Sequence, residues 1–209
     1  MSLKWNLNWS LALGLMLTLS CPFAAFAHLP TPPKKGEVGR RLTDKPVSDF
    51  VLTDQSGKPF HLAQQRGKVI AVTFIYTRCP DVCPLLSAKF AAMDRALSEE
   101  KASNYLFVSI TTDPDYDSAK KLQAYGKLFG AEKSHWVFLT GSRQALAKIW
   151  KDFGVTVTRL PGDEIQHTEL TTLIDRHGAR RVDYYGDQWQ EKQVLKDIAS
   201  LAARNQPAD

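Results

Sequence analysis

The sequence is poor in cysteine: three occur in 209 residues, and only Cys79 and Cys83 lie beyond the N-terminal apolar segment. A disulfide between two cysteines so close together closes a very small loop, and the unfolded-state entropy that a disulfide removes grows with loop length. The chain is therefore not a disulfide-stapled scaffold. The pair is predicted to serve chemistry instead, either thiol–disulfide exchange or the binding of a soft metal ion.

Runs of basic residues are also missing. The formal net charge is +5, and it falls by one without residues 1–27, because Lys4 is the only charged residue there. A phosphate-binding surface needs Lys and Arg gathered on one face. A nucleic-acid partner is therefore not expected. The sequence contains no internal repeat either.

Residues 1–27 have the layout of a secretory signal peptide, with an apolar stretch from Trp9 to Ala24 and the small-x-small end Ala25-Phe26-Ala27. The mature chain would then begin at His28. An uncleaved N-terminal membrane anchor is the alternative, because the apolar run is nearly as long as the roughly 20 residues of a spanning helix. A lipoprotein modified at Cys21 is a third reading, although the residues before it fit poorly. All three predict a periplasmic or other extracytoplasmic location.

Beyond this segment, the chain is predicted to form a tether and one domain. Residues 28–46 contain four prolines and no apolar periodicity, which predicts a Pro-rich tether. Strands and helices alternate in residues 47–205. The expected elements are a hairpin over 49–62, strands at 68–76, 105–110 and 136–139, helices at 84–97, 118–129 and 142–153, an antiparallel pair at 167–174 and 180–185, and a final helix at 187–203.

This order predicts an α/β fold with a central mixed sheet flanked by helices and preceded by an N-terminal hairpin. Cys79 and Cys83 fall between the first buried strand and its helix. Such a placement is the thioredoxin-like arrangement. The domain is therefore expected to be thioredoxin-like.

The cysteine loop is predicted to favour thiolates. Cys83 immediately precedes the expected helix start, where unpaired backbone N–H groups and the helix dipole stabilise a negative charge, and Arg78 adds a positive charge nearby. Three residues separate Cys79 from Cys83, one more than in the usual dithiol oxidoreductase. The longer loop can open both sulfurs toward one ion. Thiolates select Cu(I) or Zn(II), and imidazole suits copper as well.

A metal site of this kind needs a third ligand. His167 is the favoured histidine, because it opens the strand expected after the last crossover, near the mouth of the cysteine loop. Thioredoxins carry a proline in that region, and no proline occurs between Ile165 and Leu173. The other histidines lie at predicted strand edges, in a turn signal or at the start of the mature chain: His61, His135, His177 and His28.

Three motifs make the sequence resemble the SCO/SenC/PrrC family of copper-delivery proteins. The segment Tyr76-Thr77-Arg78-Cys79-Pro80-Asp81-Val82-Cys83-Pro84 is similar to that family's cysteine signature, Asp113-Pro114-Asp115-Tyr116-Asp117 to its D-P-x-x-D loop, and His167-Thr168 to its histidine segment. The similarity covers about residues 45–203. It implies that Cys79, Cys83 and His167 are ligands of copper, as Cu(I), Cu(II) or both.

The resemblance also implies a function. The chain would be an extracytoplasmic metallochaperone that delivers copper to the CuA centre of cytochrome c oxidase. Its partners would be the copper-bearing oxidase subunit and, as donor, another periplasmic copper chaperone; an uncleaved N-terminus would associate it with the membrane. The alternative is an enzyme, a thiol–disulfide oxidoreductase in which Cys79 and Cys83 are the redox-active pair that reduces the oxidase subunit or other exported proteins.

Two departures from the family pattern concern the surroundings of the site. Gln166 stands where an acidic residue is often found, and Thr172 where an aromatic residue is usual. Neither removes a ligand. Asp113 and Asp117 have two readings: they support the site or a partner contact, or they form a turn and a helix cap, with Asp117 capping the helix that follows.

Overall fold

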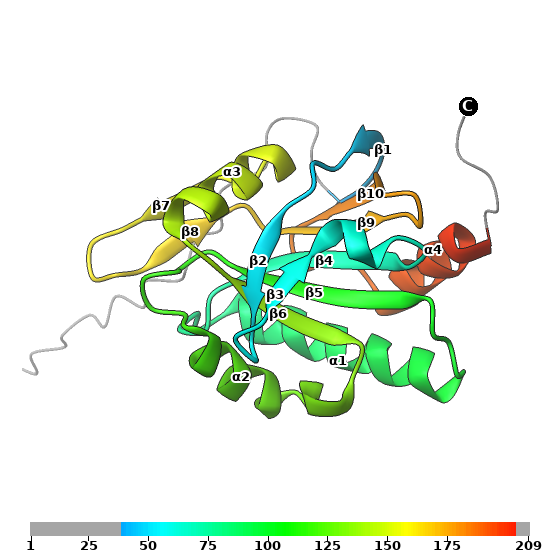
Figure 1. The fold of residues 1–209 in the computed structure, drawn as a ribbon, viewed down its shortest axis with the longest axis horizontal. Helices are drawn as coiled ribbons and strands as arrows, with labels where there is room; N and C mark the ends of the chain where they lie inside the picture. Colours follow the sequence, from blue (N-terminus) through cyan, green and yellow to red (C-terminus); the bar gives the residue numbers. More distant parts are fainter. Residues whose placement is uncertain (1–38, 204–209) are drawn as a thin grey trace, which may run out of the picture.

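The computed structural model describes residues 39–203. Among these residues, eight strands form one sheet in the order β1-β10-β9-β4-β5-β6-β2-β3, and β7 and β8 form a separate small sheet (Figure 1). β5 pairs in parallel with β4 and β6, and the other neighbours are antiparallel. The strands are β1 (Gly39–Pro46), β2 (Val51–Asp54), β3 (Pro59–His61), β4 (Val69–Ile75), β5 (Tyr105–Thr111), β6 (Trp136–Thr140), β7 (Val157–Arg159), β8 (Ile165–His167), β9 (Leu170–Ile174) and β10 (Ala179–Tyr185).

The central strand β4 is buried along its whole length. Val69 and Ala71 face one core cluster, whereas Ile70 and Val72 face the other. Successive side chains of a strand point to opposite faces, so a strand with both faces covered is apolar throughout. This explains the continuous apolar run in the sequence. It also places the loop after β4 at one end of the central sheet.

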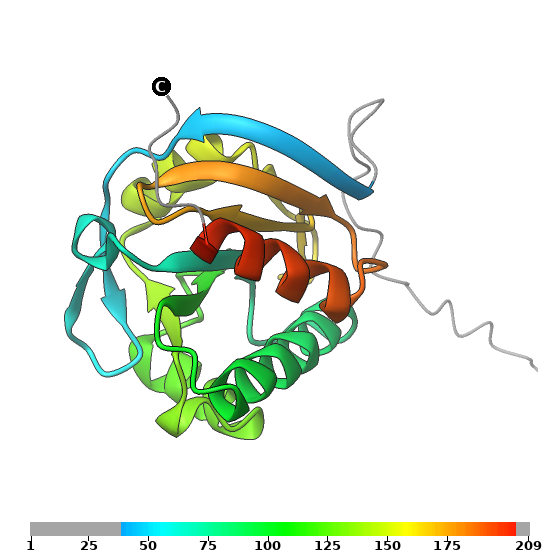
Figure 2. The same cartoon turned by 90° about the vertical axis from the view of Figure 1, so that its right-hand side faces the viewer.

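Helices cover both faces of the sheet. One core cluster contains side chains of α1, α2 and α4, and the other contains side chains of α3 and of the β2–β3 hairpin. Figure 2 shows α1 and α4 together on one side of the sheet. The helices are α1 (Val82–Glu99), α2 (Ala119–Leu128), α3 (Arg143–Phe153) and α4 (Glu191–Ala203), with short 3-10 helices at Leu62–Gln65 and Ala131–Lys133. The thioredoxin-like α/β fold with its N-terminal hairpin is thus confirmed.

The predicted tether is wrong for residues 39–46, which form strand β1 beside β10 at the edge of the sheet (Figure 2). Arg40 donates two hydrogen bonds to the Asp197 carboxylate of α4, at 2.7 and 2.9 Å, and so ties this strand to the domain. Most side chains of β1 face solvent. An edge strand of this kind lacks the apolar alternation from which strands are predicted. Residues 28–38 lie outside the described residues.

The segment before β9 also differs from the prediction. The loop around Pro161 and Gly162 is the tip of a hairpin in which β7 pairs with β8, so His167 ends β8 and does not open the next strand. Each of the two strands has only three residues, too few for a periodic pattern. His167 therefore belongs to a small satellite sheet, not to the central one.

The predicted signal peptide and the last two residues of the predicted domain, 204 and 205, lie outside the described residues. Within residues 39–203, no helix is both long enough and apolar enough to cross a membrane.

Candidate metal centre

The two cysteines occupy the junction between β4 and α1. Cys79 is 6% exposed and Cys83 1% exposed, and both are free thiols. The backbone N–H of Cys83, in the first turn of α1, donates to Sγ of Cys79 at 3.4 Å. The predicted proximity of the two cysteines is therefore present: the loop before α1 brings Cys79 back to the first turn of the helix that holds Cys83.

The predicted thiolate is not supported at Cys83. Burial raises the pKa of the Cys83 thiol well above its ordinary value, and the neighbouring Cys79 raises it further. Arg78 does not compensate, because its guanidinium pairs with Asp113 at 2.6 Å. Desolvation outweighs the helix N-terminus here. Cys83 therefore rests as a thiol, and a metal ion that binds it has to displace a proton.

Tyr76 lies close to the cysteines and to His167. The pKa of its hydroxyl is raised first by burial and then by the neighbouring Cys79 and Cys83. Its backbone carbonyl accepts a hydrogen bond from the N–H of Cys79 at 3.1 Å. Its ring meets the imidazole of His167 edge to face, with 6.0 Å between the ring centres. One aromatic side chain thus contacts both halves of the predicted ligand set.

His167 is 3% exposed, and one of its ring nitrogens has a backbone partner. Its Nδ1 lies 3.0 Å from the carbonyl oxygen of Thr168. A carbonyl only accepts hydrogen bonds, so Nδ1 carries a proton, and in the neutral imidazole Nε2 then carries the lone pair. A backbone partner on one ring nitrogen, with the other directed to the metal, is the common arrangement of metal-binding histidines.

The three predicted ligands do not form a ready-made metal cage. Within the described residues, no group of three His, Cys, Asp or Glu side chains is close enough to hold a metal ion. The structure brings Cys79 and Cys83 together and places the imidazole of His167 against the Tyr76 ring. The complete ligand set therefore stays a prediction.

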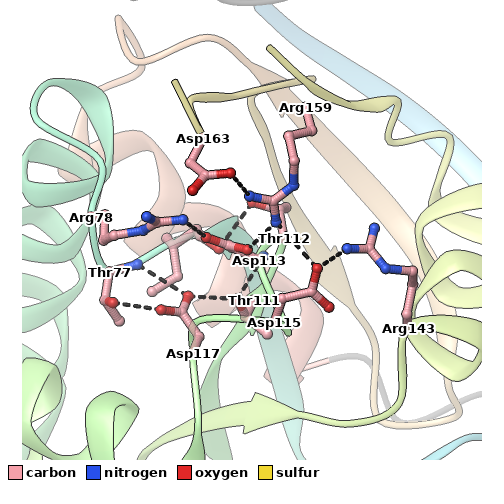
Figure 3. A network of polar contacts seen from close by, with 11 residues as sticks. Thr77, Arg78, Thr111, Thr112, Asp113, Asp115, Asp117, Arg143, Arg159 and Asp163 are labelled. Atoms are coloured by element: carbon pink, nitrogen blue, oxygen red, sulfur yellow. Dashed lines mark hydrogen bonds and ion pairs between the residues drawn. The ribbon is translucent and has the colours of Figure 1, made fainter. Parts of the chain in front are cut away.

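Asp117 braces the cysteine loop and does not cap the following helix as predicted. Its carboxylate accepts hydrogen bonds from the backbone and hydroxyl of Thr77, at 3.1 and 2.5 Å, and from the hydroxyl of Thr111 at 2.6 Å (Figure 3). Ser118 caps α2 instead, by accepting from the backbone N–H of Lys121. Burial raises the pKa of Asp117, and its hydrogen bonds oppose that rise only in part.

Asp113 is fully buried and binds two arginines. Its carboxylate contacts Arg78 of the cysteine loop at 2.6 Å and Arg159 of β7 at 2.5 Å (Figure 3). Arg159 also approaches Asp115 and Asp163, at 3.5 and 3.1 Å. The side-chain contacts of Asp113 therefore favour its predicted role as a support for the site, and its backbone carbonyl also forms the predicted turn by accepting from the N–H groups of Tyr116 and Asp117.

Comparison with known proteins identifies the family. The family model described as SCO1/SenC matches residues 39–203, which is most of the chain. The chain belongs to the SCO1/SenC family. The predicted resemblance is confirmed, and the match begins at the strand β1 that was expected to be part of a tether.

Solved SCO/SenC structures share the fold. A SCO1/SenC family lipoprotein from Bacillus anthracis str. Ames is 32% identical, with a TM-score of 0.72 over 78% of this chain and 98% of that one. BsSco, described as a member of the Sco family of cytochrome c oxidase assembly proteins and as having a disulfide switch, is 25% identical, with a TM-score of 0.68 over 78% and 96%. ScoI of Bradyrhizobium japonicum, solved with copper bound, is 27% identical, with a TM-score of 0.65 over 78% and 99%.

Sequence reasoning overlooked Arg159 as a residue of this SCO/SenC site. It lies 46 positions after Asp113, in a segment that was expected to be a loop. No sequence motif around Arg159 indicates this role. A buried carboxylate needs a charged or hydrogen-bonding partner, and Asp113 in the D-P-x-x-D loop was the signal that such a partner had to exist.

Proposed function

We propose that this chain is an extracytoplasmic copper metallochaperone that delivers one copper ion to the CuA centre of cytochrome c oxidase. Cys79, Cys83 and His167 would be the ligands. The proposal is carried by one observation: Tyr76 contacts both the paired cysteines and the imidazole of His167, so all three predicted ligands surround a single side chain.

The chemistry of this set suits copper. Two thiolates are soft ligands that hold Cu(I), and an imidazole nitrogen adds a ligand that Cu(II) favours. The Cys83 thiol loses its proton when the metal binds, so copper affinity rises with pH. For a third ligand to join the sulfurs, the Tyr76 ring or the strand that carries His167 has to shift. Incoming ligands of the oxidase subunit would then replace the three donors one at a time.

The location and the partners belong to the same proposal. The signal-like sequence of residues 1–27 supports export, with the uncleaved anchor as the alternative route to the same compartment. The oxidase subunit that bears the CuA copper would be the acceptor, as the description of BsSco suggests. Another periplasmic copper chaperone would be the donor.

A thiol–disulfide oxidoreductase is a second candidate because the two free cysteines lie close together, with the backbone N–H of Cys83 donating to Sγ of Cys79. BsSco is described as having a disulfide switch. The burial and raised pKa of Cys83 disfavour rapid thiolate attack. The carrier is therefore the better-supported function.

Metal titration tests the proposal. The reduced protein should bind one Cu(I) or one Cu(II) per chain, and the disulfide form should bind neither tightly, because both thiolates are lost. Equal affinity of the reduced and oxidised forms would rule out the ligand set. A reduced protein that binds no copper but readily reduces a disulfide substrate would favour the oxidoreductase.

A further inference from the structure

Asp113 links the two halves of the site. Its carboxylate is 0% exposed, and its two oxygens bind different arginines: Oδ2 accepts from Arg78, next to Cys79, and Oδ1 accepts from Arg159 (Figure 3). The side chains of Arg78 and Arg159 are each 31% exposed. A single buried carboxylate therefore joins the cysteine loop to strand β7.

Strand β7 is the partner of the strand that ends with His167. Arg159 lies opposite Ile165 and Val157 lies opposite His167, so the arginine and the imidazole are carried by the same short hairpin. This hairpin belongs to neither edge of the large sheet. Backbone hydrogen bonds from Leu160 to Glu164 and from Thr168 to Thr156 close its two ends internally. Besides its short link to β9, the hairpin is placed relative to the cysteines by side-chain contacts: Ile165 is buried in the same core cluster as Cys79 and Cys83, and Arg159 binds Asp113.

We infer that Asp113 and Arg159 are positioning residues that set the distance between His167 and the two cysteines. The inference rests on the proposed function, because it assumes that His167 binds copper. Arg78 holds Asp113 on the cysteine side, and Arg159 holds the hairpin on Asp113. Ion pairs that are partly withdrawn from water are screened less than exposed ones, so this bridge has a defined geometry.

Removing one side of the bridge should loosen the hairpin and leave the cysteine loop in place. Arg159→Met keeps a long side chain but loses every donor, and Asp113 stays paired with Arg78. The expected result is about 10-fold weaker Cu(II) binding, the lower end of the about 10–100-fold typical for residues that support metal ligands. Cu(I) binding should change less, because two thiolates can hold Cu(I) without the imidazole.

Three companion variants make this result specific. Arg143→Met is the matched control, because Arg143 pairs with Asp115 in the same network but projects from α3. Arg159→Lys retains a positive charge and should recover part of the Cu(II) affinity. Asp113→Asn should weaken Cu(II) binding more than Arg159→Met, because it leaves two guanidinium groups facing each other without a carboxylate.

Hydrogen exchange of the copper-free protein tests the bridge without any metal. In Arg159→Met, the amides of Leu160 and Thr168, which close the hairpin, should exchange faster than in the wild type. The amide of Phe107, bound at 2.7 Å to the carbonyl of His135 in the central sheet, should not change. Arg143→Met should leave all three amides unchanged.

The outcomes separate the inference from the proposed function. Weaker Cu(II) binding and faster hairpin exchange in Arg159→Met, absent in Arg143→Met, support the inference. Unchanged Cu(II) affinity overturns the positioning role even if exchange accelerates, and unchanged exchange overturns the bridge. A wild-type protein that binds no copper refutes the proposed function and the positioning role with it, whereas the exchange experiment still decides whether the bridge holds the hairpin.

Discussion

The two halves of the site are held by different kinds of structure. Cys79 lies in the loop between β4 and α1, and Cys83 lies in the first turn of α1. Both elements are anchored in the main core, where the ring centre of Phe90 in α1 is 4.9 Å from that of Phe107 and 5.8 Å from that of Trp136. His167 ends a two-stranded sheet outside the main one. Its hairpin reaches the cysteine loop through the Tyr76 ring and the Arg159–Asp113–Arg78 bridge.

This difference suits a carrier that has to bind copper and release it. The sulfurs stay where the packed core places them, because close-packed interiors resist displacement. The imidazole is carried by a short hairpin that contacts the main core through Ile165 and is also tied by polar contacts, which can change without unfolding the domain. The sulfur half and the histidine half should therefore respond differently to substitution.

The largest expected effect lies in the sulfur half. Cys79→Ser and Cys83→Ser should each abolish tight binding of Cu(I) and Cu(II), because each removes one of two thiolates. The loss should exceed the about 10–100-fold that a change around the ligands causes. Competition titration against a chelator of known affinity measures it. Near-wild-type Cu(I) affinity in either variant would contradict the predicted ligand set.

The core that supports the sulfurs gives the next effect. Phe90→Ala should lower the free energy of unfolding by about 3–5 kcal/mol, because it leaves a cavity among aromatic side chains. Val157→Ala in the hairpin should cost much less, since Val157 is only partly buried. Denaturant unfolding of both variants measures the contrast. Similar losses would mean that the hairpin is as much a part of the core as α1.

The histidine half should separate the carrier from the oxidoreductase. His167→Ala leaves both thiols able to form and break a disulfide, but removes a ligand. Cu(II) affinity should therefore fall more than Cu(I) affinity, and oxidase assembly in cells should become poor unless copper is supplied in excess. Spectroscopic titration and oxidase activity at low and high copper measure this.

Comparison with Cys79→Ser decides between the two functions. If His167→Ala supports full oxidase assembly at low copper while Cys79→Ser does not, the oxidoreductase is the correct function. His167 would then be a structural histidine.

The smallest effect concerns the brace on the cysteine loop. Burial raises the folded-state pKa of Asp117 above its ordinary value of 3.8. The protonated carboxyl therefore stabilises the folded state fully below pH 3.8, and this stabilisation is lost as the pH rises through the raised pKa. Asp117→Asn, which stays neutral, should therefore gain stability relative to the wild type as the pH rises from 4 to 7. Each unit of pKa difference corresponds to about 1.4 kcal/mol. Thermal unfolding at both pH values checks the sign, and the opposite trend would mean that its hydrogen bonds outweigh burial.

The sequence alone was sufficient to predict those features that depend on residues close together in the chain. The continuous apolar run of β4 predicted a strand buried on both faces, and Ser142 and Gly154 correctly bounded the helix α3, at whose C-terminus Gly154 adopts a left-handed φ of 74°. The spacing of Cys79 and Cys83 after that strand predicted their pairing at the start of a helix. Periodicity, caps and short spacings act over a few residues, so they can be read directly from the chain.

Only the tertiary structure decided how the histidine half is built. The exposed edge strand β1 and the three-residue strands β7 and β8 carry too few apolar positions to be recognised from sequence. The pKa of Cys83 is raised because the folded chain buries the thiol. Arg78 pairs with Asp113 because folding brings two distant segments together. Desolvation and long-range ion pairs are properties of the folded chain, because they arise only when folding buries residues that are far apart in the sequence next to one another, away from water.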